Sequence, residues 1–190
     1  LSKNQLEGNL TKIAKWGNIE FLDLSQNRLT GSIPSTPSQF LHLNHLNLSH
    51  NTLTNSLPKM VDQFPKLSVL DLSFNQLDGP IQSRLLSIPT LQAIHLANNF
   101  FDGNIEFSSH SGDSNLRIVN LAHNQLDGYF PDRFGSLTGL EMLNLARNNL
   151  SGSLPISMND MNSLTSLDIS ENHFTGSLPT NLSNNLERFN

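Results

Sequence analysis

The 190-residue chain contains no cysteine, and it has only one tryptophan and one tyrosine. Without cysteine, the sequence cannot form disulfides, thiolate metal sites or a cysteine nucleophile. Eleven basic residues stand against sixteen acidic ones, a formal charge of −5, and no basic run or stripe occurs. We therefore expect no nucleic-acid partner. No apolar run approaches the length of a membrane span, and no signal peptide is recognisable.

Leucine and asparagine dominate the composition, and one asparagine returns at a regular spacing after a pair of apolar residues. These marker asparagines are Asn4, Asn27, Asn51, Asn75, Asn99, Asn124, Asn148 and Asn172. The steps between them, 23, 24, 24, 24, 25, 24 and 24, are nearly constant. Around each marker the frame is L-x-x-L-x-L-x-x-N-x-L-x-G-x-I-P, as in "LDLSQNRLTGSIP" at 22–34 and "LNLARNNLSGSLP" at 143–155. Internal repeats of this period indicate a solenoid.

The chemistry of the frame predicts the local structure of each unit. Leu-x-Leu has the period of a short strand, so Leu22 and Leu24 should be buried while Phe21, Asp23 and Ser25 are exposed. The chain then turns inward, where an asparagine side chain can pair with backbone groups of the turn and of the coil above. Gly31 and its equivalents permit a backbone conformation closed to larger residues. Phe40 and Phe64 are expected to fill the outer wall.

One such unit cannot cover its own apolar face, but stacked neighbours can. The pattern resembles the leucine-rich repeats, and G-x-I-P resembles their plant-specific subclass. The resemblance implies an α/β repeat solenoid over residues 1–190, with about seven full units and partial end units. It further implies a curved, superhelical shape with a parallel concave sheet, an additional short sheet and a 3-10 or irregular convex side. Because cysteine-paired caps are absent, we expect an internal slice of a longer ectodomain.

Exposed positions of the predicted strands define a candidate binding groove. We predict that an apolar track with polar anchors on the concave face contacts a ligand, and that a sheet of seven strands, roughly 30 Å across, could hold an extended peptide. The alternative is that isolated exposed apolar residues carry no function. The candidate contact residues are Phe21, Val69, Phe74, His95, Ile118, Met142 and Arg147.

Two chemical alternatives exist for this face, a metal site and an acid–base pair. Four histidines should face the groove, but they lie on separate strands without carboxylates at ligand spacing, so no metal or cofactor is expected. They are His45, His50, His95 and His123. The scattered Asp23, Asp71 and Asp168 lie two or more strands apart, which disfavours catalysis. With no phosphate loop or nucleophile elbow, the chain is not expected to be an enzyme.

Two units depart from the frame. Asn55 stands where glycine is expected, and asparagine tolerates the left-handed conformation better than most residues. The segment "EFSSHSGDSN" at 106–115 replaces the proline-led outer segment and predicts a mobile loop that bulges from the back or side. A docking role and a tolerated insertion both remain open for this loop.

Asparagine-x-serine/threonine tripeptides predict glycosylation at Asn9, Asn47, Asn149 and Asn181. Together with the repeat class, these acceptors favour a secreted or cell-surface setting. A glycan on Asn47 would obstruct the concave groove near the second unit.

The plant-type frame resembles the ectodomains of leucine-rich-repeat receptor-like kinases, and "LLSIPTLQAIHLANN" is similar to guard-cell receptor-like pseudokinases of that family. The resemblance implies an extracellular module on the plasma membrane that binds a peptide or a co-receptor ectodomain in stomatal or stress signalling. A transmembrane helix and a kinase-like domain would then lie outside this chain. Peptide-hormone receptors of the family often present two arginines spaced by one residue, whereas only the isolated Arg117 and Arg147 lie on this face. The alternatives are a secreted polygalacturonase-inhibitor-like defence protein and a structural cell-wall module.

Overall fold

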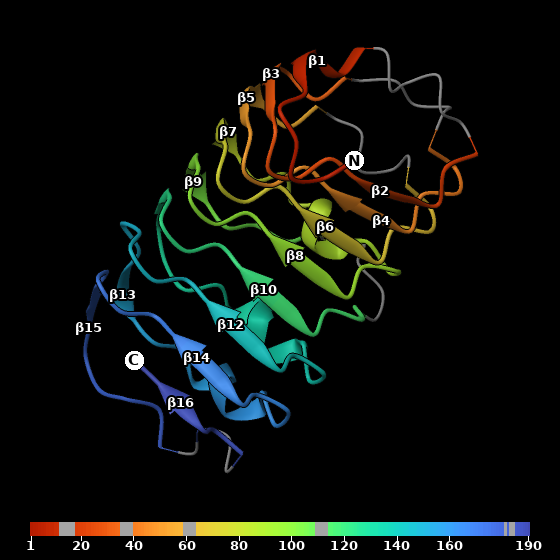
Figure 1. The fold of residues 1–190 in the computed structure, drawn as a ribbon. Helices are drawn as coiled ribbons and strands as arrows, with labels where there is room; N and C mark the ends of the chain where they lie inside the picture. The colour runs from red at the N-terminus through yellow and green to blue at the C-terminus, as the bar shows by residue number, and fades with distance from the viewer. Residues whose placement is uncertain (12–17, 35–39, 59–63, 109–113, 181, 183–184) are drawn as a thin grey trace.

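A computed structural model describes residues 1–11, 18–34, 40–58, 64–108, 114–180, 182 and 185–190. The chain winds into a series of coils that stack along one axis, so that the paired strands run parallel (Figure 1). Each coil contributes one short strand to a concave sheet and, in most coils, a second strand to a lateral sheet along one edge. The predicted repeat solenoid with a parallel concave sheet is confirmed.

The concave sheet has eight strands, one more than the seven full units that the repeat predicted. In spatial order from the N-terminal end they are β2 (Phe21–Asp23), β4 (His45–Asn47), β6 (Val69–Asp71), β8 (Ala93–His95), β10 (Ile118–Asn120), β12 (Met142–Asn144), β14 (Ser166–Asp168) and β16 (Arg188–Phe189). Equivalent residues of neighbouring coils are in register, as for Leu22 with Leu46 and Leu46 with Leu70. Side chains one repeat apart in the sequence are therefore direct neighbours across strands.

The lateral sheet confirms the additional sheet that the G-x-I-P segment implied. Six strands pair in the order β1 (Glu7–Asn9), β3 (Arg28–Gly31), β5 (Thr52–Ser56), β7 (Gln76–Pro80), β9 (Phe100–Asn104) and β11 (Gln125–Asp127). Two further strands, β13 (Ser151–Ser153) and β15 (His173–Thr175), form a separate pair, and an isolated bridge joins Tyr129 to Ser151. Gly31 and Asn55 both adopt positive φ here, 78° and 68°, as the frame predicted.

On the convex side, the helical elements of the described residues are short 3-10 helices. They include η3 (Leu85–Ser87), η4 (Asp132–Ser136) and η5 (Ile156–Asp160). Phe40 and Phe64 are buried and stack with ring centroids 5.6 Å apart, which confirms their place in the outer wall. The convex side is thus 3-10 or irregular, as the repeat subclass implied.

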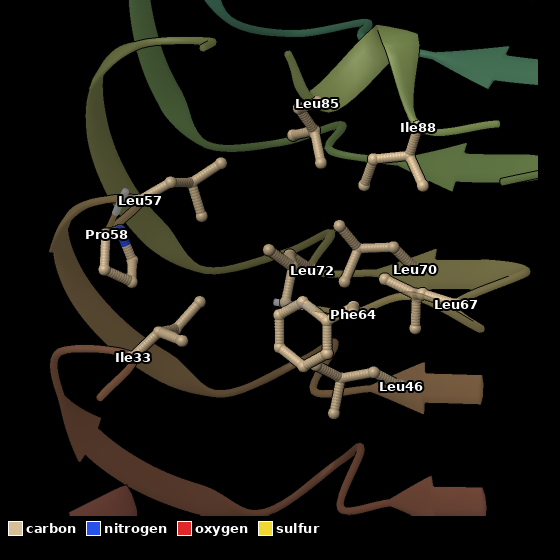
Figure 2. A pocket seen from close by; sticks show the side chains of 10 residues that line it. All are labelled: Ile33, Leu46, Leu57, Pro58, Phe64, Leu67, Leu70, Leu72, Leu85 and Ile88. Atoms are coloured by element: carbon tan, nitrogen blue, oxygen red, sulfur yellow. The ribbon is translucent and has the colours of Figure 1, made fainter. Parts of the chain in front are cut away.

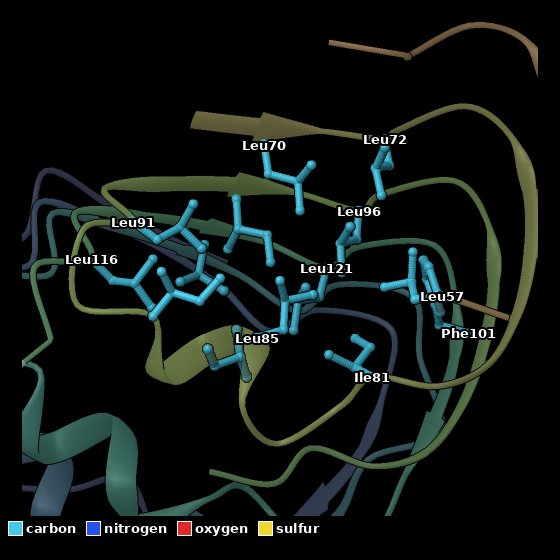
Figure 3. Packing of buried hydrophobic residues seen from close by; sticks show 14 of the residues in the cluster. Leu57, Leu70, Leu72, Ile81, Leu85, Leu91, Leu96, Phe101, Leu116 and Leu121 are labelled. Carbon is cyan, nitrogen blue, oxygen red and sulfur yellow. The ribbon is translucent and has the colours of Figure 1, made fainter. Parts of the chain in front are cut away.

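One large apolar core runs through the interior of the coils (Figure 3). Each full coil supplies two inward-facing apolar residues at its concave strand, leucine in most coils, and further apolar residues from the turn and the convex side. Most of these are almost fully buried. Because every coil covers its neighbour's apolar face, the core is continuous along the axis.

The marker asparagines connect the coils by hydrogen bonds. Asn75, which is buried, donates from Nδ2 to the carbonyl oxygens of Leu72, Ser73 and, in the preceding coil, Leu48, at 3.0–3.3 Å. Its Oδ1 accepts the backbone N–H of Leu53 at 3.0 Å. The same pattern recurs at Asn51, Asn99, Asn124, Asn148 and Asn172. The predicted pairing of these side chains with their own turn and with another coil is confirmed.

Candidate functional site

One position that the strand pattern predicted to be exposed on the concave face is buried. Leu22 and Leu24 are buried and Phe21 is exposed, as expected, but Ser25 is buried, so its predicted exposure was wrong. Serine or alanine occupies this position in each coil, and all but the last of these seven residues are buried. The chain begins to turn inward immediately after the strand, which carries this position beneath the surface.

The residue before each marker asparagine lies in the turn that ends the concave strand and has a left-handed backbone. Eight such residues have φ between 52° and 58°; they are Lys3, Gln26, His50, Phe74, Asn98, His123, Arg147 and Glu171. A left-handed non-glycine residue is uncommon and costs free energy. Its repetition from coil to coil holds these side chains along one edge of the concave face, which we call the turn column.

Aromatic pairs mark the N-terminal part of the face. Phe21 on β2 stacks on His45 of β4 with ring centroids 4.2 Å apart and planes 11° from parallel. In the turn column, His50 stacks on Phe74 at 4.1 Å and 9°. The sequence interpretation considered these histidines only as metal ligands and missed their stacking. The spacing of one repeat within each pair was the signal that could have revealed it.

The two arginines that the sequence placed on this face form ion pairs with glutamates one coil further on. A third arginine, Arg188, lies on β16 of the same sheet. Arg117 Nη1 lies 2.8 Å from Glu141 Oε1, and Arg147 Nε lies 2.7 Å from Glu171 Oε1. All four side chains are at least 45% exposed, so these pairs add little to stability. They do satisfy the guanidinium charges, which makes the arginines poorer anchors for a ligand carboxylate than the sequence suggested.

The last residue of each three-residue concave strand, between the two inward-facing positions, forms a row across the strands that we call the central column. It contains Asp23, Asp71 and Asp168, each half-buried. Oδ1 of each accepts the backbone N–H of the serine two residues later, at 2.9–3.1 Å. For Asp23, burial opposes ionisation, but hydrogen bonds from Ser25 and Ser2 outweigh it. The pKa of this carboxyl group therefore lies below its usual value.

All seven predicted contact residues lie on the concave face or in its turn column. Four are exposed, namely Phe21, Phe74, Met142 and Arg147, while Val69, His95 and Ile118 are half-buried. Ala93, between Val69 and Ile118 in the same column, is buried. The structure thus brings the candidates onto one face but divides them into an N-terminal and a C-terminal group.

Three of the four predicted glycosylation acceptors lie within the described residues. Asn9, at the end of β1, and Asn149 are exposed on the lateral side. Asn47 is half-buried on β4, the second strand of the concave sheet, and its Oδ1 accepts the N–H and Oγ–H of Ser49. Asn181 lies outside the described residues, as do residues 109–113 of the predicted loop at 106–115.

Nothing in the described part of the chain gathers three or more metal-ligating side chains at one place. The helices described there are also too short to cross a membrane. Inside the solenoid lies an apolar cavity of about 40 Å³, lined by residues such as Leu46, Phe64 and Ile88 (Figure 2). It has room for little more than a methyl group and no polar group to orient a ligand, so the candidate site remains the concave face.

The leucine-rich-repeat family model matches residues 17–77 and 114–174, and the chain belongs to this family. A stretch of 45 residues, 24% of the chain, is 62% identical to part of the LRR receptor-like serine/threonine-protein kinase GHR1 of Arabidopsis thaliana, of which it covers 4%. The match to that receptor kinase confirms the resemblance that the sequence indicated.

Solved structures of plant receptor ectodomains share the fold. PEPR1 in complex with AtPEP1 superposes with a TM-score of 0.89 at 28% identity, over 100% of this chain and 27% of that one. The Arabidopsis receptor kinase HAESA, in complex with the peptide hormone IDA and the co-receptor SERK1, gives 0.88 at 30% identity, over 94% of this chain and 30% of HAESA. The chain therefore spans less than a third of the length of these receptors.

Proposed function

We propose that this chain is part of the extracellular ligand-binding region of a plant receptor-like kinase or pseudokinase. Its concave face would bind a peptide or a partner ectodomain. The observation that supports this most directly is the set of exposed side chains Phe21, Phe74 and Met142 on that face, 62%, 46% and 39% exposed, on a regularly paired sheet. Large apolar side chains exposed on a rigid surface are typical of recognition sites.

A rigid solenoid suits this role because its surface is formed before the ligand arrives. The hydrogen-bonded coils and continuous core fix the strand positions, so association costs little ordering of the backbone. HAESA, which shares this fold, is in complex with a peptide hormone and a co-receptor. We extend that mode of action to this chain and place it on the outer side of the plasma membrane, in stomatal or stress signalling.

Alanine substitutions can test the concave face with matched controls on the lateral sheet. Phe74→Ala, Ile118→Ala and Met142→Ala should each weaken binding of peptides that were selected on the wild-type chain from a displayed random library, by about tenfold for a well-packed contact. Phe100→Ala and Tyr129→Ala remove exposed aromatic side chains of the lateral side, 51% and 76% exposed, and should leave binding unchanged. Equal losses on both sides would place recognition elsewhere.

A further inference from the structure

The N-terminal part of the concave face combines acidic and aromatic side chains in one arrangement. The central column places Asp23, Asn47 and Asp71 on three neighbouring strands in register. The Phe21–His45 stack lies on one side of this column, and the His50–Phe74 stack lies on the other, in the turn column. We call this surface over β2, β4 and β6 the acidic aromatic patch.

The dimensions of the patch fit one or two side chains of an extended segment. Asp23 and Asp71 are two strands apart, which corresponds to about 10 Å. His50 follows His45 by five positions, so the two stacks lie no more than about 17 Å apart. Each phenyl ring uses one face on a histidine and remains about half or more exposed, so the rings are held in place yet accessible.

On the strands that carry the patch, no described lysine or arginine balances its charges. Among the described residues of β2, β4, β6 and β8 there is no lysine or arginine, and the nearest cation in the turn column is Lys3, beyond Gln26. Oδ1 of Asp71 accepts the N–H and Oγ–H of Ser73, whereas no described residue pairs with its Oδ2. The C-terminal part differs, because Arg117 and Arg147 are already paired there.

We propose that the acidic aromatic patch binds an arginine side chain of an extended peptide segment. A guanidinium group is planar, stacks on aromatic rings and donates to carboxylates in a fixed geometry, so it matches both components of the patch. The depressed pKa of Asp23 is consistent with a carboxylate that stays ionised when the ligand binds. This inference rests on the proposed function and specifies the ligand chemistry of one part of its surface.

Asn47 lies between the two aspartates, so a glycan there would cover the patch. The test is therefore made in a Ser49→Ala background, which removes the acceptor tripeptide. Alanine is accommodated at this buried position, because Ala97, Ala122 and Ala146 occupy it in other coils. Unchanged thermal unfolding of the Ser49→Ala chain checks that the background is folded.

The probes are short peptides with acetylated and amidated ends, so that no terminal charge contributes. Their central residue is arginine, its neutral isostere citrulline, or glutamate, with identical flanking residues, and their affinities are measured at constant salt. We expect the arginine peptide to bind at least about tenfold more tightly than the citrulline peptide, because only arginine makes a charge-assisted contact. Asp71→Asn and Asp23→Asn should each lower this preference severalfold, because each loses one charge-assisted contact.

Asp168→Asn is the matched control, since Asp168 has the same local hydrogen bonds on a strand outside the patch. It should leave the preference for arginine intact. No preference for arginine up to millimolar concentration, or an equal loss in Asp168→Asn and Asp71→Asn, overturns the inference. If peptide binding depends on Ile118 and Met142 but not on Asp23 or Asp71, the proposed function survives and the arginine site does not.

Discussion

At the residue scale, Asn75 shows how one side chain holds three segments together. The carbonyl oxygens of Leu48 and Leu72 also accept hydrogen bonds from Asn51 and Asn99, so they keep a partner if Asn75 is removed. The N–H of Leu53 loses its bond to Oδ1. We call the hydrogen bonds of the marker asparagines the asparagine ladder. This ladder is redundant for the backbone carbonyl oxygens and less redundant for the backbone N–H groups.

Asn75→Ala should destabilise the chain by about 3 kcal/mol. This figure combines one buried N–H without its partner, about 1–3 kcal/mol, with the loss of net hydrogen-bond energy to three carbonyl groups. The free energy of unfolding is measured by urea denaturation. Gln125→Ala, at an exposed position of β11, is the control and should change it by no more than about 0.5 kcal/mol. A loss at Asn75 as small as that would contradict the ladder's structural role.

The left-handed residues of the turn column give a second prediction at this scale. His123 is exposed with φ of 55°. Asparagine adopts this conformation more readily than histidine, whereas β-branched valine resists it. His123→Asn should leave the chain equally or more stable, by up to about 1 kcal/mol, and His123→Val should destabilise it by about 1–2 kcal/mol. The unfolding temperatures of the two variants are compared. A higher unfolding temperature for His123→Val than for His123→Asn would refute this account.

The sequence predicted the asparagine ladder and Asn55 because these positions require particular chemistry. The turn column carried no such signal, since Lys3, Gln26, Phe74 and Arg147 share no property that favours positive φ. The burial of Ser25 was also missed, because strict alternation assumes that the strand continues beyond β2. For the site, periodicity predicted on which face of the solenoid each candidate residue lies. It did not predict the glutamate partners of the arginines, because these depend on the register between neighbouring coils.

At the scale of elements, the 3-10 helices of neighbouring coils pack closely at a glycine. A Cβ atom built on Gly135, in η4, would lie 2.3 Å from the backbone oxygen of Ser157 in η5. Gly139, four positions later, has no atom within 4 Å of its equivalent Cβ position. The leucine-rich frame did not foresee this contact, because it depends on how two convex segments approach each other.

Gly135→Ala should therefore separate η4 from η5 and destabilise the chain by about 1–3 kcal/mol, the usual range for overpacking. Gly139→Ala makes the same chemical change in open space and should be neutral or slightly stabilising. Both values come from the midpoint and slope of denaturant unfolding curves. Equal effects at the two positions would show that the close approach of η4 and η5 is not rigid.

At the scale of the whole molecule, each coil contacts mainly the coil before it and the coil after it. Strands β4, β6 and β8 follow one another in register, and Ser68 accepts hydrogen bonds from Gln92 and Ala93 just as Asn44 accepts them from Ser68 and Val69. Positions one repeat apart are thus interchangeable in their backbone contacts. Stability of such an array is approximately a sum over coils and their interfaces.

Deletion of residues 69–92 removes one complete period and joins Ser68 to Ala93, which occupies the position of Val69. The shortened chain should fold, with β4 paired directly to β8 and a denaturant slope lower by about an eighth, in proportion to the residues removed. Deletion of 69–80, half a period, would place turn residues opposite a strand and should not fold. Far-ultraviolet circular dichroism and urea unfolding compare the two. If both deletions fold, or neither does, coil-by-coil additivity is wrong for this chain.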